Sequence, residues 1–117
     1  MSEAALQRQV AEYLDAVLPD ECTWFHVPNG GSRNKAEAGK LKSHGVKPGV
    51  ADCILIYRGQ VIAIELKTAK GRLSNAQGYW KTIFEQAGGW FYVCRSLDDV
   101  QAVLEACQIT TKGRLSA

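Results

Sequence analysis

The sequence predicts an α/β fold, a mixed β-sheet with a central hairpin flanked by helices, in the order α-β-α-β-β-α-β-α. Two apolar runs, residues 50–57 and 60–66, are separated only by Arg58-Gly59, which suits the tight turn of a β-hairpin. A helical stretch over residues 74–86 then leads to a third apolar run, residues 90–94. Such a helical crossover lets the third strand lie parallel to the second strand of the hairpin.

The other elements are predicted by helix caps and apolar periodicity. A first helix begins after Ser2, carries an apolar residue about every fourth position, and stops before Pro19. The remaining elements are a strand over 23–27, a basic helix over 34–44 and a last helix from Ser96 or Asp98 to about 107. We expect one domain over residues 1–108 and a flexible polar tail over residues 109–117.

Composition places the chain among ordinary globular proteins. It has 117 residues, of which 46% are hydrophobic and 22% charged, and no apolar run is long enough to cross a membrane. The first residues do not show a basic stretch followed by an apolar one, so we expect no secretory signal. The four cysteines lack close-pair spacing, which favours buried free thiols in a reducing compartment over disulfides or a zinc site. We therefore expect a cytoplasmic, intracellular protein without a membrane partner.

Three charged residues interrupt the apolar hairpin. If Arg58-Gly59 is a two-residue turn, paired positions sum to 117, so Asp52 lies opposite Glu65. Because side chains alternate along a strand, Lys67 shares a face with Glu65. Like charges directly opposed across two strands are destabilising, and a hard divalent cation would cancel the repulsion. The hairpin therefore predicts a metal site.

Basic residues gather on both sides of the hairpin in the sequence. Residues 28–47 and 67–81 hold nine of the fourteen Lys and Arg, and Glu37 is their only acid. If these segments also flank the hairpin in space, they form a surface for a polyanion; the alternative is a solvated basic face. The residues that we expect to contact DNA are Arg33, Lys35, Lys40, Lys42, Lys47, Lys70 and Arg72.

Three further polar residues each have two interpretations. From its position, Glu3 is a first-turn acid favoured by the helix dipole, although it also falls on the inward stripe of the first helix. Gln77 completes a capping box with Ser74. His26 interrupts an apolar strand, and such a histidine is more often packed or hydrogen-bonded than a ligand.

The Asp-x12-Glu-x-Lys pattern on a hairpin resembles the PD-(D/E)xK nuclease superfamily. The longer strings G-V-A-D-C-I-L-I and I-A-I-E-L-K-T-A-K-G-R-L-S-N-A-Q resemble the VRR-NUC (virus-type replication-repair nuclease) family. The upstream strings E-A-A-L-Q, H-V-P-N-G-G-S-R and L-K-S-H-G fit the same family, so the resemblance covers about residues 3–95. One residue departs from it, since Ala51 stands where the family usually has proline.

The resemblance implies a restriction-endonuclease-like core and a DNA endonuclease that depends on Mg²⁺ or Mn²⁺. It implies that Asp52, Glu65 and the backbone carbonyl of Leu66 bind the metal. Lys67 would be the catalytic lysine, which orients or activates water and neutralises developing charge. The family's glutamine and its first-helix acid match Gln77 and Glu3, and this gives Glu3 a place in the site.

The substrate is the least defined part of the prediction. Family analogy and small size favour a homodimer acting on a four-way DNA junction, in recombination, replication or repair. Flap cleavage or general nicking is a second possibility. Two other classes stay open: a nucleic-acid-binding module without catalysis, and a structural domain whose acids are surface charges. No nucleotide cofactor is expected.

Overall fold

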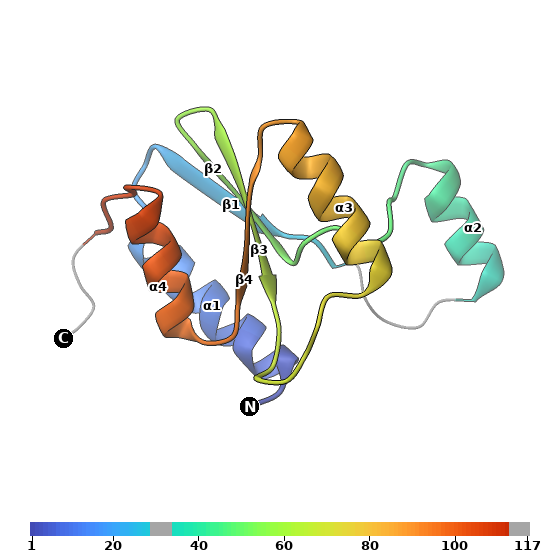
Figure 1. Cartoon of the computed structure of the whole chain (residues 1–117), viewed down its shortest axis with the longest axis horizontal. Coiled ribbons are helices and arrows are strands. Elements are labelled where there is room, and N and C mark those ends of the chain that lie inside the picture. Colours follow the sequence, from blue (N-terminus) through green and yellow to red (C-terminus); the bar gives the residue numbers. More distant parts are fainter. Residues whose placement is uncertain (29–33, 113–117) are drawn as a thin grey trace.

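The computed structural model describes residues 1–28 and 34–112 and has the expected order of elements (Figure 1). In chain order they are α1 (Glu3–Val17), β1 (Cys22–His26), α2 (Lys35–Ser43), β2 (Cys53–Tyr57), β3 (Gln60–Leu66), α3 (Asn75–Gln86), β4 (Trp90–Cys94) and α4 (Leu97–Ala106). Arg33 lies outside the described residues, so its expected contact with DNA has no structural counterpart.

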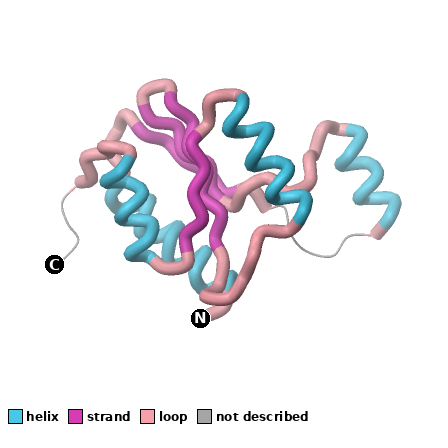
Figure 2. Tube along the Cα trace, viewed as in Figure 1, coloured by secondary structure: helices cyan, strands magenta, loops and turns pink. Residues whose placement is uncertain are grey.

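The four strands form one mixed sheet in the order β1-β2-β3-β4. Strands β2 and β3 are antiparallel with Tyr57 opposite Gln60 and Cys53 opposite Ile64, so the predicted register is confirmed. Both turn residues have positive φ, 50° at Arg58 and 85° at Gly59, as a two-residue hairpin of the favoured twist requires. Strand β4 lies parallel to β3 after the α3 crossover. Figure 2 shows the strands passing through the centre of the molecule.

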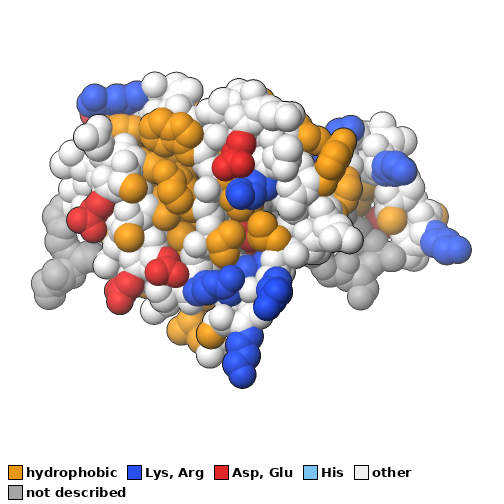
Figure 3. All heavy atoms as spheres, viewed as in Figure 1, with side chains coloured by type: hydrophobic (Ala, Val, Ile, Leu, Met, Phe, Trp, Pro, Cys, Tyr) orange, Lys and Arg blue, Asp and Glu red, His pale blue; other side chains and the backbone are white. Residues whose placement is uncertain are grey.

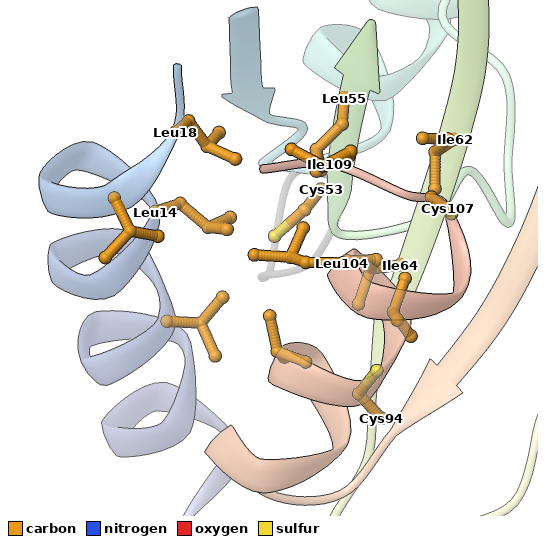
Figure 4. Packing of buried hydrophobic residues seen from close by; sticks show 14 of the residues in the cluster. Leu14, Leu18, Cys53, Leu55, Ile62, Ile64, Cys94, Leu104, Cys107 and Ile109 are labelled. Atoms are coloured by element: carbon orange, nitrogen blue, oxygen red, sulfur yellow. The ribbon is translucent and has the colours of Figure 1, made fainter. Parts of the chain in front are cut away.

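Helices cover both faces of this sheet (Figure 1). Helices α1 and α4 pack together on one face, and alternate residues of β3, including Ile62 and Ile64, fill the core between them (Figure 4). Helix α3 covers the other face, where Trp80 and Phe84 pack near Ala63. Because side chains alternate along β3, Glu65 lies on the α3 face rather than in the larger core.

Helix α2 is the most exposed of the helices: none of its residues is buried, and only Leu41 is half-buried. Figure 1 shows it standing apart from the sheet, beside α3. The connection from α2 to β2 returns past the first turn of α3, where a Cβ on Gly49 would lie 2.3 Å from the carbonyl oxygen of Ala76. A glycine with φ of 78° is therefore required at the entry to the hairpin.

The end of the chain is better packed than the sequence predicts. The sequence predicts a flexible tail from residue 109, yet Ile109 is buried in the core against α4. The Lys112 backbone N–H donates to the carbonyl of Val17, and its ammonium group lies 3.2 Å from Asp20. The prediction is therefore wrong for residues 109–112, because a single apolar residue in a polar segment can anchor it; residues 113–117 lie outside the described part. No helix among the described residues is long and apolar enough to span a membrane.

Candidate active site

The predicted acidic pair lies at one end of the hairpin. Asp52 directly precedes β2, and continuing the β2–β3 register places it opposite Glu65. Its carboxylate Oδ2 accepts a hydrogen bond of 2.8 Å from the backbone N–H of Leu66, which fixes the side chain across the strand pair. The opposed carboxylates that the sequence predicts are thus brought together.

Glu65 is buried, with only 2% of its surface exposed. Its Oε2 accepts a hydrogen bond of 2.9 Å from the Gln77 side chain and lies 3.5 Å from the Lys67 ammonium group. Lys67 is itself 8% exposed. Buried charges of this kind are costly unless they are paired, so Glu65 is not an ordinary surface charge.

Gln77 makes the capping contacts that the sequence predicts and also reaches Glu65. Its Oε1 accepts from the Ser74 backbone N–H at 2.8 Å, and the Ser74 hydroxyl accepts from the Gln77 backbone, which completes the capping box. The same amide then uses Nε2 to donate to Glu65. One side chain thus joins the start of α3 to the acidic pair.

The pKa of Glu65 is raised from its usual 4.5 to about 7. Burial is the largest cause, and the neighbouring Asp52 carboxylate adds to it; Lys67 acts in the opposite direction. The lysine therefore only partly offsets the electrostatic cost of the two acids. A further positive charge at this point would stabilise the ionised pair.

The donor set fits a hard divalent cation. Protein N–H groups bind one oxygen of each carboxylate, Oδ2 of Asp52 and Oε2 of Glu65. No group of three or more His, Cys, Asp or Glu suited to a metal occurs in residues 1–28 and 34–112. Mg²⁺ commonly uses one or two carboxylates and keeps several waters, so two acids and the Leu66 carbonyl are a plausible set.

A hollow of about 520 Å³ opens beside Asp52 and Leu66. Glu3 lies at its rim, but it is exposed, and the buried stripe of α1 begins at Leu6. The expectation that Glu3 faces the core is therefore wrong, because α1 begins at Glu3 and its buried stripe starts only at Leu6. Glu3 does share the hollow with Asp52, as the resemblance implies.

His26 also lines this hollow and supports the backbone of Asp52. Its Nδ1 lies 2.8 Å from the carbonyl oxygen of Asp52, which also accepts a hydrogen bond from the Val27 N–H. Because a carbonyl can only accept, Nδ1 carries the proton in this contact. His26 is thus a hydrogen-bonded histidine, as such a residue in an apolar strand more often is.

Solved structures with a similar fold were found by comparison. One chain, described as "VRR_NUC domain protein", is 25% identical with a TM-score of 0.73, covering 91% of this chain and 87% of that chain. A second, described as "VRR_NUC domain", is 19% identical with a TM-score of 0.61, covering 88% of this chain and 94% of that chain. The sequence matches no protein-family model and no curated protein.

The chain folds as a VRR-NUC domain. The predicted fold class is confirmed, since the chain shares its fold with solved structures described as VRR-NUC domains.

The residues expected to contact DNA fall into two exposed groups. Lys35, Lys40, Lys42 and Lys47 lie on α2 and the connection after it, whereas Lys70 and Arg72 lie on the loop after β3. Figure 3 shows Lys and Arg side chains over that loop and over α2, while acidic side chains gather over α4. The second group lies on the loop that begins directly after Lys67.

The sequence does not point to Arg95, which directly follows β4 and binds the loop after Lys67. No spacing rule connects an arginine to carbonyl groups more than twenty residues earlier. The only available signal is its place: β3 and β4 are parallel and paired, so the residues that follow them leave the same edge of the sheet.

Proposed function

We propose that this chain is a metal-dependent DNA endonuclease that hydrolyses phosphodiester bonds. The observation that carries the proposal is the buried Glu65, which faces Asp52 and has the Lys67 ammonium group at 3.5 Å. A binding module gains nothing from two opposed carboxylates of which one is buried, whereas a metal-assisted hydrolase uses them. The nuclease-domain fold of its structural relatives supports the same conclusion.

Asp52, Glu65 and the Leu66 carbonyl would hold Mg²⁺ or Mn²⁺, which supplies Lewis acidity toward a phosphate oxygen and makes a bound water more acidic. Other groups of the chain hold these two carboxylates in place. The Leu66 N–H orients Asp52, and Gln77 orients Glu65.

Lys67 acts on the reacting phosphate. Its ammonium group is fixed beside Glu65, where it can neutralise charge that develops as the water oxygen bonds to phosphorus and the bond to the leaving sugar oxygen breaks. Its low exposure strengthens this effect, because surrounding water screens the charge less. We propose Glu3 and Gln77 as supporting members of the site.

The finer proposal concerns the substrate. We propose branched DNA, in particular a four-way junction cut by a homodimer. Flap or general nicking is the alternative. The basic residues of α2 and of the loop after β3 would bind backbone phosphates, giving affinity that falls with salt and depends little on sequence.

The test is a cleavage panel of four-way junction, flap and plain duplex DNA with Mg²⁺, Mn²⁺ or EDTA. We expect cleavage only with metal, and we expect Lys67→Ala and Asp52→Ala each to reduce the rate by about 10²–10⁴-fold. Lys112→Ala is the matched control, because that exposed lysine pairs with Asp20 away from the acidic pair. Cleavage that survives both site substitutions would refute the proposal, and salt-sensitive binding without any cleavage would favour a non-catalytic binding module.

A further inference from the structure

Arg95 closes a tight turn in the loop that follows Lys67. Its Nη1 lies 2.7 Å from the carbonyl oxygens of both Thr68 and Gly71, and 3.4 Å from that of Ala69. The Gly71 N–H also donates to the Thr68 carbonyl at 3.1 Å. Charge-assisted hydrogen bonds of this kind are among the stronger ones in proteins, so one guanidinium group holds the loop in a defined shape.

This turn is placed directly against Lys67. A Cβ added to Gly71 would lie 3.3 Å from Cδ of Lys67, so the turn packs on the stem of the lysine. Arg95 is itself held in place, since its backbone N–H donates to the Asp99 carboxylate at 2.8 Å. The Lys67 N–H donates to the Cys94 carbonyl, which ties the two chain segments together before the turn begins.

The same turn borders a second hollow of about 730 Å³, lined by residues 69–73 and Arg95. Three of the lining residues, Lys70, Arg72 and Arg95, are cationic, and none is acidic. Among the described residues, Nη2 and Nε of Arg95 make no hydrogen bond. The guanidinium therefore binds the loop through one nitrogen and keeps donors for another ligand.

The peptide groups of the turn add to this character. The carbonyls of Thr68 and Gly71 point toward Arg95. Because a trans peptide sets its N–H opposite its carbonyl, the N–H groups of Ala69 and Arg72 point away from the guanidinium. Backbone donors turned outward beside basic side chains make an environment that favours an anion.

We propose that Arg95, Lys70 and Arg72 form a subsite for a backbone phosphate of a nucleic-acid strand, directly beyond Lys67. The planar fork of arginine suits a phosphate group, and the two exposed side chains add attraction from the loop. The contact of Gly71 with Lys67 fixes the subsite relative to the acidic pair, so a phosphate held there sets how the strand enters the site. The inference rests on the proposed nuclease function for its ligand.

The experiment measures binding separately from cleavage. The dissociation constant of a short fluorescein-labelled DNA duplex is determined by anisotropy in EDTA, over a series of KCl concentrations. We expect Lys70→Ala and Arg72→Ala each to raise Kd about fivefold at low salt and to reduce the salt slope by about one. We expect Arg95→Met to raise Kd and to reduce the salt slope at least as strongly. It removes one phosphate-binding side chain and also the hydrogen bonds that hold the turn carrying Lys70 and Arg72.

The matched control is Arg58→Met, which removes the same charge from the hairpin tip, where that arginine pairs with Glu21. It should change Kd and the salt slope little. A folded Arg95→Met protein that binds DNA like the Arg58→Met protein would overturn the proposal. If Arg95→Met does not fold, unchanged binding by Lys70→Ala and Arg72→Ala, which alter exposed loop residues, would overturn it equally.

These outcomes are distinct from failure of the nuclease function. Weakened binding by the three variants in a protein that never cleaves DNA would support the subsite and reject the nuclease. If the protein cleaves DNA normally with metal, and none of the three substitutions changes Kd or the salt slope, only the subsite would be rejected.

Discussion

Glu65 makes the stability of the metal-free protein depend on pH. Its pKa is about 7 in the folded chain and near the usual 4.5 when unfolded, so the folded state binds the proton more tightly between these values. The free energy of unfolding should therefore fall as pH rises from about 4.5 to about 7, by on the order of 3 kcal/mol. A bound divalent cation would offset this loss by favouring the ionised carboxylate.

The measurement is the Tm at about pH 5 and about pH 8 in EDTA and in MgCl₂, for the native chain and Glu65→Gln. Other groups titrate in the same range, so the informative quantity is the difference between the two proteins. We expect the native chain alone to lose Tm toward pH 8 in EDTA and to regain it with Mg²⁺. Equal pH and Mg²⁺ responses in the two proteins would show that Glu65 is neither strained nor a ligand.

Gln77 can be separated into its two roles because the chain offers a matched variant. Ser74→Ala removes the helix cap but leaves the Gln77 amide able to reach Glu65, whereas Gln77→Ala removes both contacts. We expect each substitution to destabilise the fold by about 1 kcal/mol. Only Gln77→Ala should slow cleavage, by about tenfold, because only that change frees the carboxylate. Similar cleavage rates for the two variants would limit Gln77 to capping.

At the scale of the element, α2 contributes charge and little stability. It has nine residues and buries none of them, and helices shorter than about 12–15 residues are marginal in water by themselves. The Asn34 side chain caps its first turn, and Gly45, with φ of 100°, follows its last residues. The helix is therefore held by local contacts and presents its lysines on an exposed surface.

We predict that Lys40→Ala/Lys42→Ala leaves the Tm within a few degrees but weakens DNA binding and lowers the salt slope by about two. The unchanged Tm follows from the exposure of both side chains. Arg58→Ala/Lys112→Ala removes the same charge elsewhere and is the control, read by thermal unfolding and anisotropy. If the two double variants bind equally, net charge rather than α2 determines affinity.

The whole molecule shows which parts of the site follow from local rules. The Asp52–Glu65 pair could be predicted because a two-residue turn fixes register and strand periodicity then fixes the face. Positions that depend on packing between distant segments could not be predicted in this way. Glu3 precedes the buried stripe of α1, which starts at Leu6, and Ile109 packs into the core after α4. Arg95 belongs with these, since its partners are set by the parallel pairing of β3 and β4.

Symmetry gives the last prediction, about assembly on DNA. Each 12.8 kDa chain offers one Asp52–Glu65 pair, and symmetrical cutting of a four-way junction needs two such pairs related by a two-fold axis. We therefore expect the Lys67→Ala protein, which leaves the junction uncut, to bind it as two chains per junction. Size exclusion with light scattering measures this mass directly, and plain duplex DNA is the comparison. One chain per junction, together with a monomer in free solution, would remove the basis for a dimer. The two strands would then be cut in independent events, and the junction would hold no advantage over a flap, because a single acidic pair meets only one strand at a time.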